Sequence, residues 1–305
     1  MNSVGIATVC GILVAQSSLS VAVENKPRSG IRVTYLGNAG YQIEDGKVVI
    51  LVDPYISQFR PGGMGPTDFN DKTDPILMPD AAGIDKRIMR ADYIFITHSH
   101  SDHLLDAPYI AKKTHAVIIG SAGTVRIARV RGVPDDQTIL VKGGEDYAFD
   151  DFSLRVIPSL HSPLLKKHYN NGPWAQDVPT HLKMPIHESA YAEGGSFVYL
   201  LRIAGHQIFI MGSMNYIERE VEGLRPDIAI VGSGASRKEI YDYTGRLMRA
   251  LGCPATVFPT HWDSLGSMSH EQAANGAQGF ASEVKRGCPN TNVIIPDYFK
   301  AIEFK

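Results

Sequence analysis

The sequence predicts an α/β protein built from two packed β-sheets whose outer faces are covered by helices. The chain has 305 residues, of which 44% are hydrophobic, and a chain of this size can bury a large core within one domain. Short β-type runs recur along its whole length, and helical patterns stand between them instead of gathering in one region. Such interspersed elements are typical of sheets that are covered by helices.

Three β-type runs open the predicted fold. They are "IRVTYLG" at Ile31 to Gly37, "GYQIED" at Gly40 to Asp45 and "KVVILVD" at Lys47 to Asp53. Asp45-Gly46, between the second and third runs, is a strong signal for a tight turn. The second and third runs are therefore expected to form a hairpin.

Further strands are expected where β-branched and aromatic residues lie between turn residues. They fit Tyr93 to Thr97, Ala116 to Gly120, Thr138 to Val141, Leu154 to Pro158, Phe197 to Ile203, Gln207 to Met211, Ile228 to Gly232, Thr256 to Pro259 and Val293 to Ile295. Helices are expected where apolar residues recur at helical spacing. They fit Asp80 to Met89, the stretch after His103, Thr124 to Val130, Tyr216 to Gly223, Lys238 to Leu251 and His270 to Arg286.

Two segments rich in proline, glycine and asparagine lack a regular pattern, and we interpret them as loop insertions at residues 57–79 and 162–195. Long irregular loops in a compact domain are usually lids or walls of a binding site, or else disordered. The second loop contains Tyr169, Trp174 and Tyr191, which disfavours simple disorder.

The first 22 residues differ from the rest and predict a secretory signal peptide. Val4 to Ala15 is uncharged and apolar, and Ser20 to Ala22 has the small-x-small pattern that a signal peptidase needs. The apolar stretch is too short for a stable membrane span. No basic residue precedes Lys26, so a disordered N-terminus is the alternative. We expect residues 23–305 to form a single catalytic domain that is periplasmic or secreted, or cytoplasmic if the leader is not a signal.

Two cysteines remain after such a leader, Cys253 and Cys288. Each lies at the end of a predicted helix, so both can lie at the same end of the fold. An exported protein permits a disulfide between them. Two buried free thiols are an equally open alternative.

Composition and motif content exclude several classes of function. A net charge of −2 and a pI of about 6.6 offer no basic surface to a nucleic acid. Neither the "GxSxG" of serine hydrolases nor the "GxxxxGKS/T" of phosphate-binding loops occurs. "VGSGASRKE" resembles a dinucleotide-binding turn, but Arg237 stands where the third glycine belongs. We therefore expect a small-molecule substrate, and the oligomeric state stays open.

The segment "ITHSHSDHL" (Ile96 to Leu104) places three histidines and an aspartate within six positions, directly after an apolar run. Imidazole nitrogens and carboxylate oxygens are ligands of zinc and related cations. His98 and His100 are alternate residues that can converge on one ion, and Asp102 and His103 on the following turn can face a second ion. Chance clustering in a solvated loop is the alternative, and we favour the metal site.

Two further histidines end β-type runs, His161 in "VIPSLH" and His261 in "TVFPTH". A lone histidine at such a position is more often an ordinary surface or core residue. Their shared place at strand ends makes both candidates for the same site.

These motifs resemble the metallo-β-lactamase superfamily, whose signature "HxHxDH" appears here as "HSHSDH", and the likeness covers the whole mature chain. The resemblance implies a four-layer αββα sandwich with two divalent metal ions at one edge. Asp53 would be buried behind the histidines and help to orient them. The implied ligands are His98, His100 and His161 for the first ion, and Asp102, His103 and His261 for the second.

The segments "LGNAG", "ILVDP" and "PTHWD" resemble the ascorbate-6-phosphate lactonase-like branch more than true β-lactamases. One departure concerns the second ion. Most dinuclear relatives have a bridging aspartate where this chain has Ser213, in "FIMGSMN", and a hydroxyl is a poor ligand. We therefore expect a tight first zinc and a looser second one, with manganese or iron as alternative metals.

The implied reaction is hydrolysis by a metal-bound hydroxide, because a zinc pair lowers the pKa of water towards about 7 and polarises the oxygen under attack. Asp102 is a candidate for protonating the leaving group if it is released from the metal, and Tyr169 and Tyr216 are further candidates. Tyr169, Trp174 and Tyr216 are also expected to line an apolar wall for a small acyl-bearing substrate. A lactone is preferred. A phosphodiester, a β-lactam and a non-catalytic metal-binding role are the alternatives.

Overall fold

Two seven-stranded β-sheets form the body of the protein. The computed structural model describes residue 1 and residues 30–59, 74–263 and 270–305. Apart from Met1, the leader expected at residues 1–22 lies outside the described residues, as does most of the loop at 57–79.

The first sheet is mixed. Its β1 to β3 meander is antiparallel, as the hairpin signal indicated, and the strands from β3 to β6 pair in parallel. In order across the sheet the strands are β14 (Ala301–Phe304), β1 (Ile31–Gly37), β2 (Gly40–Glu44), β3 (Val49–Val52), β4 (Tyr93–Phe95), β5 (Val117–Gly120) and β6 (Thr138–Leu140).

The second sheet is also mixed. Strands β10 to β13 pair in parallel, and β7 to β10 pair antiparallel. In order across the sheet the strands are β13 (Asn292–Val293), β12 (Thr256–Thr260), β11 (Ile228–Gly232), β10 (His206–Met211), β9 (Phe197–Ile203), β8 (Phe152–Pro158) and β7 (Asp146–Ala148).

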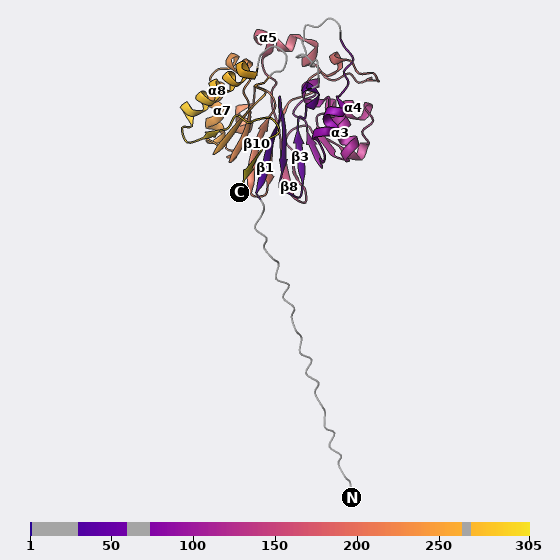
Figure 1. Cartoon of the computed structure of the whole chain (residues 1–305), viewed down its shortest axis with the longest axis horizontal. Coiled ribbons are helices and arrows are strands. Elements are labelled where there is room, and N and C mark those ends of the chain that lie inside the picture. The colour runs from indigo at the N-terminus through magenta and orange to yellow at the C-terminus, as the bar shows by residue number, and fades with distance from the viewer. Residues whose placement is uncertain (2–29, 60–73, 264–269) are drawn as a thin grey trace.

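Helices lie outside both sheets, which confirms the predicted layers. The α-helices are α1 (Ala81–Arg87), α2 (Ser101–Leu104), α3 (Ala107–Thr114), α4 (Ala122–Val130), α5 (Leu164–Lys167), α6 (Glu218–Val221), α7 (Tyr243–Leu251) and α8 (His270–Gly287). Figure 1 shows α3 and α4 on one side of the strands and α7 and α8 on the other. Within the described chain, none of these helices has the length and apolarity needed to cross a membrane.

Some sequence predictions need correction. The helix expected from Lys238 begins at Tyr243, because Asp242 has a left-handed φ of 40° that interrupts it after the 3₁₀ turn η6 (Ala235–Glu239). The helix expected at Tyr216 to Gly223 is a single turn, α6. Strands β7 and β14 escaped prediction because they are short edge strands without buried residues.

The core between the sheets forms because side chains alternate along the strands. In β1, Ile31, Val33 and Tyr35 are buried, while Arg32 between them is exposed. They pack with residues of the second sheet such as Tyr199. The four residues of β3 are all buried, as expected for a strand covered on both faces. Burial on both sides fixes the register, and therefore the position of whatever follows each strand.

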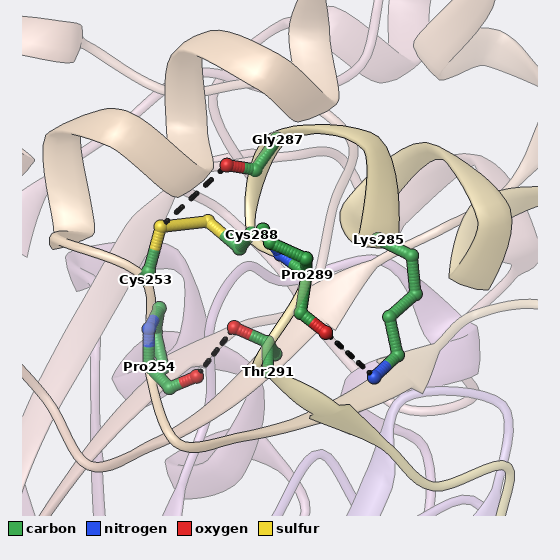
Figure 2. Close-up of a disulfide and its surroundings, with 7 residues drawn as sticks. All are labelled: Cys253, Pro254, Lys285, Gly287, Cys288, Pro289 and Thr291. Atoms are coloured by element: carbon green, nitrogen blue, oxygen red, sulfur yellow. Dashed lines mark hydrogen bonds between the residues drawn. A yellow bond between two sulfur atoms is a disulfide. The ribbon is translucent and has the colours of Figure 1, made fainter.

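A disulfide joins Cys253 and Cys288, so the disulfide alternative is the one that the structure contains. Figure 2 shows the bond beside the end of α8, with Thr291 Oγ1 donating to the Pro254 carbonyl at 2.8 Å. The two cysteines are 35 residues apart. A bond of this loop length restricts the unfolded chain and stabilises the fold by about 2–4 kcal/mol.

We expect the double variant Cys253→Ser, Cys288→Ser to lose about 2–4 kcal/mol of unfolding free energy, because its unfolded chain regains the freedom that the bond removes. Urea denaturation with and without a reductant would measure the loss. Reductant should destabilise the native protein by a similar amount and leave the double variant unchanged. Equal sensitivity of both proteins to reductant would contradict the assignment.

Candidate metal centre

Three histidines from two separate segments converge to form the first group of ligands. His98 and His100 follow β4, and His161 follows β8. One nitrogen from each lies within 4.8 Å of the others, and His98 Nε2 is 3.1 Å from His100 Nδ1. The structure therefore brings together the three residues implied for the first ion.

The second group lies directly beside the first and includes Asp102 and His103 of α2. Their ligand atoms and one nitrogen of His98 lie within 4.8 Å of one another, so His98 belongs to both groups. His261, which follows β12, places Nε2 3.2 Å from Asp102 Oδ2, and its ring centroid is 5.4 Å from that of His103. All six candidate ligands therefore meet at one edge of the two sheets.

Asp53 lies at the end of β3 and is fully buried behind the histidines. Oδ1 accepts the Thr97 N–H at 2.8 Å, and Oδ2 accepts Thr97 Oγ1–H at 2.5 Å and His103 Nδ1–H at 2.8 Å. Gly212 leaves room for this arrangement, because a Cβ there would lie 2.2 Å from Thr97 Oγ1. The orienting position expected for Asp53 is thus the one observed.

Each histidine of the HxHxDH segment, and His161, donates its outer ring N–H to an oxygen. The acceptors of His100 and His161 are the carbonyls of Trp174 and Ser162, each at 3.1 Å, and a carbonyl can only accept. His98 Nδ1 faces Thr97 Oγ1 at 3.2 Å, whose proton goes to Asp53. This arrangement is typical of metal-binding histidines, because in a neutral imidazole held this way the lone pair lies on the inner nitrogen, where it can bind an ion.

Burial and charge set the protonation of the two groups differently. Burial, with repulsion from neighbouring imidazoles, lowers the pKa of His98 and His161 well below the usual value, and burial lowers that of His100 to about 4. Burial would also lower the pKa of His103, but the carboxylates of Asp102 and Asp53 raise it to about 10. At neutral pH the three imidazoles of the first group are therefore uncharged. His103, between two carboxylates, is protonated on both nitrogens and carries a positive charge.

The donor set fits a divalent metal ion in both groups. The first group offers three neutral imidazole nitrogens. In the second, His103 Nε2 is buried without a hydrogen-bond partner among the described residues, although Asp102 Oδ2 is only 3.4 Å away. A buried nitrogen beside a carboxylate, with its other nitrogen held by Asp53, is what a metal ligand requires.

Asn38 also contacts the candidate ligands, and its role was not predicted from the sequence. Its Nδ2 donates to the backbone carbonyl of Asp102 at 3.0 Å and to Asp102 Oδ2 at 3.2 Å. The backbone carbonyl of Asn38 accepts the backbone N–H of His261 at 2.7 Å. Asn38 has a φ of 52°, a left-handed conformation that asparagine adopts more readily than most residues. An asparagine in the tight "LGNAG" turn was the available signal.

The remaining candidates have defined contacts. Ser213 Oγ accepts the Ser162 N–H at 3.0 Å, beside His161. Tyr216 lies in the core between the second sheet and α7, with its hydroxyl on the Tyr243 carbonyl at 3.0 Å. Trp174 reaches the site through its carbonyl.

Tyr169 is 4% exposed and stacks on His161. Burial and the charge of Glu193 raise the pKa of Tyr169 above the usual value, so its hydroxyl does not readily give up its proton to a leaving group at neutral pH. Its role against a substrate, like those of Trp174 and Tyr216, stays a prediction.

Comparison with known families decides the assignment. Residues 32–261 match the family described as "Beta-lactamase superfamily domain". The chain belongs to the metallo-β-lactamase superfamily. The match runs from β1 to His261, and so includes every candidate ligand.

Relatives within this superfamily carry the name UPF0173 metal-dependent hydrolase. The protein of Polynucleobacter asymbioticus is 27% identical over 289 residues, covering 88% of this chain and 90% of that protein. The protein of Flavobacterium johnsoniae is 31% identical over 132 residues, covering 43% of this chain and 49% of that protein, so this match spans about half the relative's length.

Two solved structures share the metallo-β-lactamase fold with this chain. Igni18, a metallo hydrolase from Ignicoccus hospitalis, has a TM-score of 0.59 at 17% identity and covers 90% of this chain and 98% of its own. The metallo-β-lactamase fold protein YhfI from Bacillus subtilis has a TM-score of 0.54 at 12% identity and covers 90% and 100%. At such identities the likeness establishes the fold alone.

The different protonation of the two groups predicts pH-dependent binding of the second ion. Because His103 holds a proton up to a pH of about 10, an ion must displace it, and second-site affinity should rise roughly tenfold per pH unit between pH 7 and 9. First-site affinity should stay constant there, because the pKa of His100 is about 4 and its partners are also neutral. Calorimetric titration with Zn²⁺ across this range, in two buffers, would show one proton released by the second ion only. Equal proton release by both ions would contradict the assignment.

Proposed function

We propose that the protein is a metal-dependent hydrolase that opens a cyclic ester, with a lactone as its substrate. The observation that carries the proposal is the set of outer-nitrogen hydrogen bonds made by His98, His100, His103 and His161, which leaves their inner nitrogens facing two adjacent ligand groups. Histidines whose outer nitrogens are held by hydrogen bonds support metal binding more strongly than a cluster of histidines without such bonds. The names of the UPF0173 relatives agree with it.

Divalent ions held there would lower the pKa of water towards about 7 and polarise the carbonyl under attack. Asp102 would accept and then donate the proton that is transferred during hydrolysis. His103 and His261 hold its pKa well below the usual value in spite of burial, so at neutral pH Asp102 is a proton acceptor. We propose that Asp102 Oδ2, when it is released from the second ion, takes the proton of the attacking water and passes it to the leaving oxygen of the opened ring. Asn38 Nδ2 donates to Asp102 Oδ2 and keeps that carboxylate oxygen in place.

We propose zinc in both groups, held tightly in the first and more weakly in the second. Ser213 supports this difference, because its neutral hydroxyl stands where a bridging acid would lie and is engaged by the Ser162 N–H. The charge of His103 supports it as well, because an ion in the second group has to displace a proton. Manganese or iron in place of zinc is an outcome that metal analysis of the purified protein would reveal.

The lactone assignment rests on the likeness to the lactonase-like branch and on the surroundings of the site. Leu160 is 47% exposed and directly precedes His161 in the chain, so an exposed apolar residue adjoins this ligand. Lys167, from the loop at residues 162–195, points its Nζ to within 3.7 Å of Glu239, so its charge is partly compensated. An uncharged acyl substrate suits this setting better than a phosphodiester does.

The test is a substrate panel for the zinc-loaded protein: lactones of several ring sizes, a chromogenic β-lactam and bis(p-nitrophenyl) phosphate. We expect lactone opening, recorded as acid release at constant pH, and loss of this activity after chelation. Cleavage of the phosphodiester alone would overturn the lactone assignment. Inactivity on every substrate with both ions bound would favour a non-catalytic metal-binding protein.

We also infer that the protein folds in an oxidising compartment, as an exported protein would. The disulfide between Cys253 and Cys288 supports this inference, because such bonds persist outside the cytosol and are rare within it. Alkylation of thiols in freshly fractionated cells would test it. Both cysteines should resist alkylation in the periplasmic or secreted fraction, and full alkylation would contradict export.

A further inference from the structure

The loop at residues 162–195 reaches the first ligand group through the backbone of Trp174. His100 Nε2 lies 3.1 Å from the Trp174 carbonyl oxygen, which keeps the imidazole proton on Nε2. Nδ1, 3.1 Å from His98 Nε2, then keeps its lone pair towards the group. The same carbonyl accepts the backbone N–H of Glu193 at 2.7 Å. The tautomer of His100 therefore depends on how this loop is held.

Tyr169 of the same loop contacts two of the three ligands. Its ring stacks on that of His161, with centroids 4.4 Å apart and planes inclined by 14°. Its hydroxyl lies 3.4 Å from His100 Nε2 and donates to Glu193 Oε2 at 2.9 Å. Because that proton goes to Glu193, a hydroxyl lone pair remains for His100 Nε2–H. The stacked ring also restricts His161 to one orientation.

Glu193 connects Tyr169 to the HxHxDH segment. Its carboxylate accepts the Tyr169 hydroxyl and also the Ser196 hydroxyl, at 2.6 Å. Its backbone carbonyl accepts the N–H of Ser99, the residue between His98 and His100, at 2.9 Å. A single residue thus fixes both Tyr169 and the backbone that carries two ligands.

We propose that Tyr169 and Glu193 are positioning residues of the first metal site, which set its affinity by fixing the ring of His161 and the tautomer of His100. The inference rests on the metal centre of the proposed function and does not depend on the substrate. Partners of this kind, which hold the outer side of ligand histidines, typically contribute about 10- to 100-fold to metal affinity.

Three variants of the full chain separate the contributions. Tyr169→Phe keeps the stacked ring and loses the hydroxyl, and we expect first-site affinity to fall about tenfold. Tyr169→Leu also loses the stacking, and we expect a fall of about a hundredfold. Glu193→Gln keeps an acceptor oxygen but loses the charge, so its effect should be no larger than that of Tyr169→Phe.

The measurement is competition for Zn²⁺ between the chelator-stripped protein and a chromophoric chelator, at one equivalent of metal. The visible absorption of the Co²⁺-loaded protein reports the geometry of the site, and we expect its bands to shift in both Tyr169 variants. Thermal unfolding of the metal-free proteins shows whether any variant has lost its fold. The Phe variant, which removes a single atom, keeps the test decisive if the Leu variant does not fold.

The matched control is Tyr191→Phe. Tyr191 also belongs to this loop, is 3% exposed, and accepts a hydrogen bond from Arg131 Nε at 2.8 Å. Its loss loosens the loop without removing a contact to a ligand histidine, so Zn²⁺ affinity and the Co²⁺ bands should stay as in the native protein. Equal losses in Tyr191→Phe and Tyr169→Phe, or an unchanged site in Tyr169→Leu, would overturn the proposal. Since no substrate is used, the expected order of affinities in a protein without lactonase activity would refute the proposed function alone.

Discussion

Replacing His98 with alanine is expected to lower kcat/KM for the hydrolysed substrate by about a thousandfold or more, because it removes one ligand of the first group and leaves a gap beside His103 of the second. Its Nε2 lies 3.1 Å from His100 Nδ1, and its ring centroid is 3.9 Å from that of His103. No other candidate ligand belongs to both sets of atoms within 4.8 Å. Metal content and kcat/KM of the purified variant would measure the effect, and both ions should be lost or bound weakly.

A control for this variant is His115→Asn. His115 is exposed and follows α3 with a φ of 63°, and among the described residues its ring has only a long contact with Gln137 Nε2, at 3.4 Å. Asparagine tolerates this left-handed conformation, so metal content and activity should match those of the native protein. A His98→Ala protein that retains two tightly bound ions would show that the groups are not metal sites.

The candidate ligands could be found in the sequence because each follows a β-type run. Strand ends are visible as the point where an apolar run stops, and His98, His161 and His261 all follow such points. The buried faces of a sheet leave each strand one register, so residues after neighbouring strands arrive at the same edge. The sandwich and the convergence of these candidate ligands were therefore predictable together.

The residues that hold the ligands were much less predictable. Asn38 acts from a turn more than 60 positions before Asp102, and Trp174 acts through a carbonyl that every residue possesses. Glu193 lies near the end of the loop at residues 162–195, and nothing in its sequence neighbours shows that Tyr169 will donate to it. These roles depend on contacts between distant segments, which neither periodicity nor spacing encodes.

The same reason explains the missed edge strands. Strand β14 pairs with β1 through Ile31 to Thr34, but two of its four residues are exposed and it shows no buried run. Its place is decided by the free edge of β1 and not by its own composition. A buried strand can be recognised from the apolar pattern of its own sequence. An edge strand or an orienting contact cannot, because it depends on the segment with which it pairs.

Replacing Asp53 with asparagine is expected to lower second-site metal affinity by about a hundredfold and to reduce activity with it. Two oxygens of Asp53 accept three protons, from the Thr97 N–H, the Thr97 hydroxyl and His103 Nδ1–H. An amide can keep one acceptor but presents N–H groups to the other partners. Once His103 has lost one proton, as an ion in the second group requires, the remaining proton would stay on Nε2, the nitrogen that faces the metal group, and no lone pair would be left there for the ion. Metal titration by calorimetry would show a weakened second site beside a nearly unchanged first site.

Measurements of unfolding free energy and a control at a second buried acid distinguish the orienting role of Asp53 from a general requirement for a buried carboxylate. Asp53→Ala leaves buried donors and the charge of His103 without their partner, and we expect it to cost about 3–5 kcal/mol of unfolding free energy. Asp106→Asn is the matched control, since Asp106 is equally buried and accepts the Ser57 N–H at 2.8 Å without contacting a ligand. Burial raises the pKa of Asp106 to about 7, so a neutral amide should be tolerated there and metal affinity should not change. If Asp106→Asn weakened the second site as much as Asp53→Asn, the loss would reflect general loosening of this sheet, and the tautomer of His103 would not be its cause.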